Sequence, residues 1–235
     1  MIAGLQKMTL LDYPGKVACT VFLQGCNFRC PFCHNSSLLG KPQAPSLSQE
    51  ELLAFLRKRQ GILDGVCITG GEPTLCKELP ELLKSIKDLG FDIKLDTNGY
   101  RPDVLMSLVS QGLVDYVAMD IKNCPDRYGE TAGISNLDLA KIQESMVFLM
   151  NGDLDFEFRT TVVAQYHTQK EIQAIGRWFQ ALSPNGKVKK YFLQPYTDRD
   201  SVLCSGLWAP EKADLQGFCT IMEPFVHRVE IRGYE

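Results

Sequence analysis

Short apolar runs alternate along this chain with longer segments in which apolar residues recur at helical spacing. Six runs have the length of a strand: 17–23, 62–69, 91–97, 114–121, 154–163 and 191–194. After each strand, apolar residues recur every three or four positions, as in an amphipathic helix. Behind the first strand, a cysteine-containing loop comes before this helical pattern. Six alternations of strand and helix predict an α/β fold, with a parallel sheet that helices cover.

Local signals define several ends of these predicted elements. Ser48 and Glu51 form a capping-box pattern that begins a helix, and Gly90 ends the next one. The first 16 residues are a polar lead-in with a turn at 12–15. No change of composition marks a boundary, so we expect a single domain over 1–235. It consists of the lead-in at 1–16, six βα units over 17–225, and a C-terminal strand and tail at 226–235.

Six units are too few for a closed eight-stranded barrel, and an open doubly wound sheet also satisfies the pattern. In both architectures ligands bind beyond the carboxyl ends of the strands. Polar groups follow four strands here: the cysteine-containing loop, Gly70-Gly71-Glu72, Asp96-Thr97-Asn98 and Asp120-Ile121-Lys122. These groups are therefore expected to face one cavity.

The composition and net charge of the chain limit the kinds of molecule that it is expected to bind. The chain has 235 residues, 45% of them apolar and 23% charged, with a net charge of −3. A chain with this net charge is not basic enough to bind along the phosphate backbone of a nucleic acid, so we expect no nucleic-acid partner. The apolar runs are too short to span a membrane, and the N-terminus lacks the pattern of a signal peptide. A cytoplasmic location is expected.

Three of the nine cysteines lie within eight residues, directly after the first predicted strand. Cys26, Cys30 and Cys33 have the spacing C-x3-C-x2-C, and three thiolates so close indicate a metal centre. Zinc ribbons use two C-x2-C pairs, and no second pair exists here. Ferredoxin motifs supply four cysteines for each cluster. Three cysteines would leave one iron of a 4Fe-4S cluster without a protein ligand, and we expect one such cluster. The open alternative is a Cys3His zinc site that adds His34, in a noncatalytic zinc-binding or scaffold protein.

This motif, C-x3-C-x-aromatic-C, resembles the signature of the radical S-adenosylmethionine (SAM) superfamily. The flanking segments 22–26 and 33–35 resemble the glycyl-radical-enzyme activases, most closely the activating protein of anaerobic ribonucleoside-triphosphate reductase. The resemblance covers nearly the whole chain and implies a partial (βα)6 barrel. It also implies that Cys26, Cys30 and Cys33 hold the 4Fe-4S cluster, and that SAM binds the open iron.

The same resemblance implies roles for the other candidate residues. Gly70, Gly71 and Glu72 would bind the amino group of SAM, with Asp96 nearby, while Asp120 and Lys122 would reach its ribose and carboxylate. Phe32 and His34, which flank the cofactor-binding residue Cys33, would lie against the adenine, and Arg159 and Val163 would line the same pocket. A monovalent-cation site is also implied, formed by Asp96, Thr97, the carbonyl of Met119, and Asp120.

One position departs from the family pattern. In pyruvate formate-lyase activases a histidine that contacts SAM follows a Pro-Tyr pair, but here Thr197 follows Pro195-Tyr196. This difference weakens the case for pyruvate formate-lyase as the partner. His167 and His227 have no motif around them, and we interpret both as structural or solvated.

The implied reaction needs no side chain as a general acid or base. Flavodoxin or ferredoxin would reduce the cluster, and SAM would split into methionine and a 5′-deoxyadenosyl radical. That radical would take a hydrogen atom from a glycine of the partner, expected to be anaerobic ribonucleoside-triphosphate reductase. Segments 10–15 and 36–47 are expected to form the docking rim. The alternatives are activation of another glycyl-radical enzyme, such as pyruvate formate-lyase, or action on a small molecule, as in the related carboxy-deazaguanine synthase.

Overall fold

The structure is a computed structural model that describes residues 2–40, 46–183, 185–199 and 201–233. Internal contacts divide the chain into two compact units. The first unit comprises Met1–Asn27, Ser37–Thr97 and Arg101–Ala118, and the second comprises Phe28–Ser36, Asn98–Tyr100 and Met119–Glu235. Each unit is described by itself. The organisation of 1–235 as a single domain stays a prediction.

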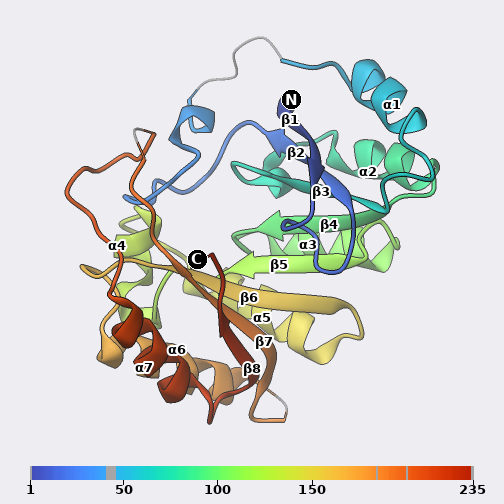
Figure 1. The fold of residues 1–235 in the computed structure, drawn as a ribbon. Coiled ribbons are helices and arrows are strands. Elements are labelled where there is room, and N and C mark those ends of the chain that lie inside the picture. The colour runs from blue at the N-terminus through green and yellow to red at the C-terminus, as the bar shows by residue number, and fades with distance from the viewer. Residues whose placement is uncertain (1, 41–45, 184, 200, 234–235) are drawn as a thin grey trace. The chain divides into compact units, whose positions relative to one another are not determined.

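The first unit contains four neighbouring strands, β1 (Ile2–Thr9), β2 (Ala18–Leu23), β3 (Gly65–Gly70) and β4 (Asp92–Thr97) (Figure 1). β2 and β3 pair in parallel, with Ala18 opposite Gly65 and Leu23 opposite Gly70. β3 and β4 also pair in parallel. β2 and β3 therefore end at the same edge, and the segments after Leu23 and Gly70 leave the sheet side by side.

Strand β1 lies within the predicted lead-in, where no strand was expected. It pairs with β2 in the antiparallel direction. Its middle residues Gln6 and Lys7 are exposed, while Ile2 and Thr9 at its two ends are buried. Because three consecutive residues, Gln6, Lys7 and Met8, are exposed, the strand lacks the apolar run by which the other strands were recognised. The predicted turn at 12–15 is present, since Lys16 N–H donates to the Tyr13 carbonyl at 3.2 Å.

Helices α1 (Gln49–Arg57), α2 (Leu79–Lys87) and α3 (Pro102–Ser110) also belong to the first unit, and a short 3-10 turn, η2 (Pro73–Leu75), follows β3. The capping box that begins α1 is confirmed. Glu51 N–H donates to Ser48 Oγ at 3.1 Å, and Ser48 N–H donates to the Glu51 carboxylate at 2.8 Å. Gly90 follows α2 with φ +86°, as expected for a residue that ends a helix. Another 3-10 turn, η1 (Ser36–Leu38), follows the cysteine-containing loop.

The second unit contains three parallel neighbours, β6 (Asp155–Val162), β7 (Val188–Pro195) and β8 (Val226–Ile231). β8 confirms the strand predicted at 226–231. Helices α5 (Leu139–Asn151), α6 (Gln169–Leu182) and α7 (Lys212–Met222) lie at the positions that the apolar spacing predicted. Strand β5 (Tyr116–Asp120) begins in the first unit and ends in the second.

Two short elements of the second unit were not predicted, η3 (Pro125–Arg127) and α4 (Tyr128–Ala132). Five helical residues are too few to show a periodic pattern. The parallel strand pairs and the intervening helices of both units confirm the α/β class with a mostly parallel sheet. Within the described ranges, no helix combines the length and the apolar character needed to cross a membrane.

The position of segment 10–15 corrects one expectation. This segment follows Thr9, which lies opposite Ala18 at the amino end of β2. It therefore lies at the amino ends of the parallel strands, whereas Gly70-Gly71-Glu72 lies at their carboxyl ends. The prediction that 10–15 helps to form a docking rim around the ligand cavity is wrong. Of the other predicted rim segment, 36–47, residues 41–45 lie outside the described residues.

Candidate active site

The glycine pair after β3 is held against the end of β2. Gly71 N–H donates to the Leu23 carbonyl at 2.8 Å, and Glu72 N–H donates to the Gly25 carbonyl at 2.7 Å. A Cβ atom at Gly70 would lie 2.4 Å from the Leu23 oxygen, and one at Gly71 would lie 2.1 Å from the Gly25 oxygen. Only glycine allows this close approach of two backbones. The first residues of the cysteine-containing loop are thereby fixed to the turn that carries Glu72.

The carboxylate of Glu72 is buried and held by three donors. Its Oε1 atom accepts hydrogen bonds from Thr74 N–H at 3.1 Å, from Thr74 Oγ1 at 2.6 Å and from Thr97 Oγ1 at 2.8 Å. The side chain is 1% exposed. Thr97 ends β4, so this carboxylate joins the carboxyl ends of β3 and β4. The predicted residues Gly70, Gly71, Glu72 and Thr97 are thus brought together in the first unit.

Asp96 forms an ion pair that the sequence did not reveal. A buried carboxylate at the end of an apolar strand was expected to need a partner. The structure shows that partner to be Lys94, two residues earlier on the same face of β4. Lys94 is buried as well, and its Nζ atom lies 3.8 Å from Cys67 Sγ. Lys94 belongs to the polar lining of this strand end, although it was not among the predicted site residues.

In the second unit, Asp120 lies between two cations. Its carboxylate pairs with Arg159 through Nε and with Lys122 Nζ at 2.9 Å. Burial by itself would raise the pKa of Asp120, but the charges of Arg159 and Lys122 outweigh burial and hold this pKa well below its usual range. Asp120 is therefore ionised near neutral pH. Three predicted site residues form one charged group: Asp120 at the end of β5, Lys122 just after it and Arg159 within β6.

The charge of Lys122 extends this group toward the cysteine-containing loop. Burial would lower the pKa of Lys122, but Asp120 and then Cys30 raise it above its ordinary value. Lys122 also acts on His34, whose pKa is lowered, mainly by burial. The ammonium group of Lys122 thus lies within electrostatic reach of two residues of the loop. A compact cation at this place suits recognition of a carboxylate.

The three candidate cluster cysteines are not joined in disulfides. Cys30 is buried, and Cys26 and Cys33 are half-buried. In the second unit, Cys33 N–H donates to the Cys30 carbonyl at 3.1 Å, so a tight turn separates these two residues. Within the described ranges, no three His, Cys, Asp or Glu side chains are already grouped so as to hold a metal ion. Cysteine thiolates are the usual ligands of iron–sulfur clusters, so the donor type of this loop suits such a cluster.

Phe32 and His34 point to different neighbours. The ring of Phe32 is buried against Tyr166 and His167, with centroid separations of 5.9 and 6.2 Å. The ring of His34 stacks on Tyr196 at 5.6 Å, and its Nε2 atom lies 2.7 Å from the Thr197 carbonyl oxygen. Thr197 therefore contacts His34 through its backbone.

Val163 and His167 lie at the carboxyl end of β6. Val163 N–H donates to Nδ1 of His167 at 3.1 Å, and both residues are buried. His167 was interpreted from the sequence as structural or solvated. The structure buries it, and sequence reasoning gave it no place near the candidate site. No motif surrounds His167, and its bond to Lys122 joins residues 45 positions apart, so only the fold reveals this position.

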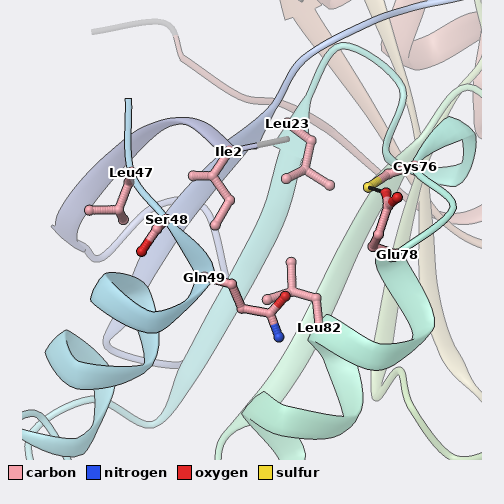
Figure 2. A pocket seen from close by; sticks show the side chains of 8 residues that line it. All are labelled: Ile2, Leu23, Leu47, Ser48, Gln49, Cys76, Glu78 and Leu82. Carbon is pink, nitrogen blue, oxygen red and sulfur yellow. Dashed lines mark hydrogen bonds between the residues drawn. The ribbon is translucent and has the colours of Figure 1, made fainter. Parts of the chain in front are cut away.

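The first unit also contains a pocket of about 300 Å³ that no predicted site residue lines (Figure 2). Four of its side chains are apolar, and Cys76 donates a hydrogen bond to Glu78 at one end. Its lining residues are Ile2, Leu23, Leu47, Ser48, Gln49, Cys76, Glu78 and Leu82.

Comparison with known families gives one domain match. The model of the radical SAM superfamily matches residues 20–154, which include the three cysteines, the Gly-Gly-Glu turn and the acidic ends of β4 and β5. The match covers more than half of the chain.

Curated relatives agree with this match. A protein of Methanocaldococcus jannaschii, named as a candidate glycyl-radical enzyme activating enzyme, is 28% identical over 99% of this chain and 95% of its own length. The pyruvate formate-lyase-activating enzyme of Clostridium pasteurianum is 35% identical over 53% of each chain. The 7-carboxy-7-deazaguanine synthase of Methanospirillum hungatei is 32% identical over 65% of this chain and 62% of its own.

A solved structure supports the fold. SuiB of Streptococcus suis superposes with a TM-score of 0.68 over 91% of this chain and 48% of its own, at 14% sequence identity. At this level of identity, the similarity shows a common fold and no more.

Proposed function

Because this chain belongs to the radical SAM superfamily, we propose that it is an activase that cleaves SAM reductively and generates a glycyl radical on a partner enzyme. The similarity to the M. jannaschii protein carries the activase assignment, since it extends over 99% of this chain and 95% of the relative. The similarities to the lyase-activating enzyme and to the synthase cover smaller parts of the chain.

Cys26, Cys30 and Cys33 are the proposed ligands of one 4Fe-4S cluster. When bound and reduced, such a cluster supplies the electron that breaks a carbon–sulfur bond of SAM. The chain's part is to hold the loop and the substrate. Gly70 and Gly71 fix the start of the loop against β3 through the close backbone contacts described above. The positive charge of Lys122 and the Cys30 thiol influence each other electrostatically.

The proposed SAM contacts in the first unit are Gly70, Gly71, Glu72, Asp96 and Thr97. Glu72 is a buried acceptor held by two threonines, and an acceptor of fixed position suits the amino group of SAM. Asp96 is held by Lys94 near the same strand end. No proton transfer by a side chain is required.

The proposed SAM contacts in the second unit form a charged and an apolar group. Asp120 would reach the ribose, and Lys122 the carboxylate, with Arg159 holding Asp120 in place. Phe32, Cys33, His34 and Val163 would lie against the adenine. Asp96, Thr97, Met119 and Asp120 stay a predicted site for a monovalent cation.

The proposed partner is anaerobic ribonucleoside-triphosphate reductase, with flavodoxin or ferredoxin as electron donor in the cytoplasm. The cysteine-flanking segments support this partner by their resemblance, as does the presence of Thr197 in place of the histidine of pyruvate formate-lyase activases. Activation of pyruvate formate-lyase is the main alternative within the same chemistry, because a lyase-activating enzyme is among the relatives.

The test is formation of a glycyl radical. The protein is reconstituted with iron and sulfide without oxygen and mixed with SAM, dithionite and each candidate partner. Electron paramagnetic resonance should then show the doublet of a glycyl radical with the reductase and none when the Cys30→Ser variant replaces the wild type. A doublet with pyruvate formate-lyase alone would correct the partner, and cleavage of SAM without any doublet would contradict the activase.

A second function, action on a small molecule, is favoured by the similarity to 7-carboxy-7-deazaguanine synthase. That similarity covers about two thirds of both chains rather than their full length. Formation of 7-carboxy-7-deazaguanine in place of a glycyl radical would establish it. A zinc protein is distinguished by its metal content, because a brown protein with about four irons per chain carries an iron–sulfur cluster.

A further inference from the structure

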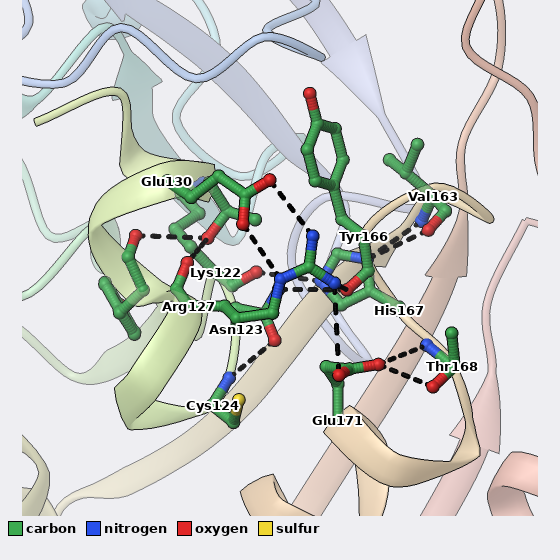
Figure 3. Close-up of polar contacts among 12 residues, drawn as sticks. Lys122, Asn123, Cys124, Arg127, Glu130, Val163, Tyr166, His167, Thr168 and Glu171 are labelled. Carbon is green, nitrogen blue, oxygen red and sulfur yellow. Dashed lines mark hydrogen bonds and ion pairs between the residues drawn. The ribbon is translucent and has the colours of Figure 1, made fainter.

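The imidazole of His167 joins the ends of two strands (Figure 3). Its Nε2 atom lies 2.8 Å from the carbonyl oxygen of Lys122, just after β5, and its Nδ1 atom lies 3.1 Å from the amide nitrogen of Val163, just after β6. Lys122 and Val163 are both proposed SAM contacts. The side chain is 1% exposed, so water does not compete for these bonds.

Nδ1 lies 3.1 Å from the Val163 amide nitrogen and 3.2 Å from the Val163 carbonyl oxygen, so this residue alone does not decide which ring nitrogen carries the proton. A proton on Nδ1 would leave the lone pair of Nε2 facing the Lys122 carbonyl oxygen at 2.8 Å, so the arrangement favours Nδ1 as the acceptor of the Val163 N–H. Nε2 then carries the hydrogen and donates to the Lys122 carbonyl. A neutral histidine with one donor and one acceptor satisfies both backbone groups. Burial agrees with this state, because it lowers the pKa of His167 to about 4.

The ring also meets the cysteine-containing loop. Phe32, which precedes the proposed cluster ligand Cys33, packs against His167 in an edge-to-face arrangement at 6.2 Å between ring centroids. One side chain thus contacts three segments: the loop, the end of β5 and the end of β6. Each of these segments carries a residue that is proposed to contact SAM.

Other bonds tie the same two strand ends together without His167. Asn123 Nδ2 donates to the Tyr166 carbonyl at 3.1 Å, and Arg127 Nη1 donates to the same oxygen at 3.2 Å (Figure 3). Arg127 is itself held by Glu130. Loss of the imidazole would therefore leave the segments joined while freeing the Lys122 carbonyl and the Val163 amide group. Its effect would be local.

From this arrangement we infer that His167 is a positioning residue for SAM, which sets the backbone of Lys122 and Val163 and supports Phe32. The inference rests on the proposed function, because the proposed function assigns Lys122, Val163 and Phe32 to the SAM site. A buried histidine with a structural role alone would alter stability and leave the affinity for SAM unchanged.

Two amide variants separate the two bonds. In His167→Gln, the side-chain NH₂ group can reach the Lys122 carbonyl in place of Nε2. In His167→Asn, the side-chain oxygen can accept from Val163 in place of Nδ1, and the bond to Lys122 is lost. Tyr191→Phe is the matched control for stability, because it removes a buried hydrogen bond to Thr160 Oγ1 of 2.7 Å in the strands.

The measurement is the dissociation constant of SAM for the anaerobically reconstituted protein. Loss of one hydrogen bond corresponds to about a fivefold to tenfold change. We expect His167→Asn to weaken SAM binding by that factor, His167→Gln to bind within about threefold of wild type, and Tyr191→Phe to bind as wild type despite lower stability. Nitrogen NMR of the unreconstituted chain should show His167 protonated on Nε2, with the other two histidines assigned by substitution.

Several results would overturn the inference. Wild-type affinity in His167→Asn would do so, as would equal losses in both amide variants and in Tyr191→Phe, or a proton on Nδ1. These outcomes differ from failure of the proposed function, in which the wild-type protein itself does not bind SAM.

Discussion

The hydroxyl of Thr97 donates a hydrogen bond of 2.8 Å to the buried carboxylate of Glu72. Glu72 follows β3 and Thr97 ends β4, so one bond between two side chains joins the carboxyl ends of these strands. It also orients the carboxylate that is proposed to receive the amino group of SAM. A carboxylate held in this way does not need to be ordered when the substrate binds.

Replacing Thr97 tests this bond. Thr97→Val keeps the shape of the side chain and removes the donor, so the free energy of unfolding should fall by about 2 kcal/mol, the range for a hydrogen bond to a charged group. Thr97→Ser retains the hydroxyl and should lie much closer to wild type. Urea unfolding of the full chain measures both. Equal stability of the two variants would show that the bond contributes nothing.

A substitution at Gly71 tests the contact between the cysteine-containing loop and the turn after β3. A methyl group there would overlap the Gly25 carbonyl oxygen at 2.1 Å. Gly71→Ala should therefore cost about 1–3 kcal/mol and lower the iron bound after reconstitution.

Gly217 in α7 provides the matched control, because a Cβ atom there meets nothing within 4 Å. Gly217→Ala should stabilise the chain by about 0.5–1 kcal/mol, since alanine is the better helix residue. Iron content and thermal unfolding should be measured for both. Wild-type stability and iron content in Gly71→Ala would mean that the two backbones can separate without effect.

Because His167 is buried, we expect the free energy of unfolding to depend on pH. Burial lowers its pKa from the ordinary value of 6.5 to about 4 in the folded chain. Between these values the unfolded chain binds more protons, so stability falls as the pH is lowered from 6.5 to 4 and is fully present above 6.5. The shift corresponds to about 3 kcal/mol. Urea unfolding at a series of pH values measures it.

The comparison with His167→Gln isolates this contribution. Arg127 and Glu171 both act on His167, and Glu171 has a lowered pKa of its own. His34 has a lowered pKa too and contributes in the same direction. The variant keeps these groups and should lose only part of the slope between pH 4 and 6.5. An unchanged slope would show that His167 takes up its proton equally well in the folded chain.

The sequence predicted the elements whose signals are local. Apolar spacing located all the longer helices, and the capping box at Ser48 marked the start of α1. Strand β1 was missed because its exposed residues Gln6 and Lys7 break the apolar run. Helix α4 was missed because five residues show no period.

The candidate site was predictable where a motif exists. The cysteines and the Gly-Gly-Glu turn are short patterns with a chemical reason. Lys94 gave no such signal, because a lysine within a strand is expected to face solvent, and its burial depends on Asp96. His167 was missed as a site neighbour because its bond to Lys122 joins residues 45 positions apart. Such contacts arise from the fold and leave no local pattern.

The most direct measurement is the formation of 5′-deoxyadenosine from SAM by the anaerobically reconstituted protein with dithionite, followed by chromatography. The wild type should produce 5′-deoxyadenosine and methionine. Cys30→Ser should produce none, while circular dichroism shows that it is folded. Cleavage retained by Cys30→Ser, or no cleavage by an iron-loaded wild type, would contradict the proposal that three thiolates hold a cluster with one iron open to SAM.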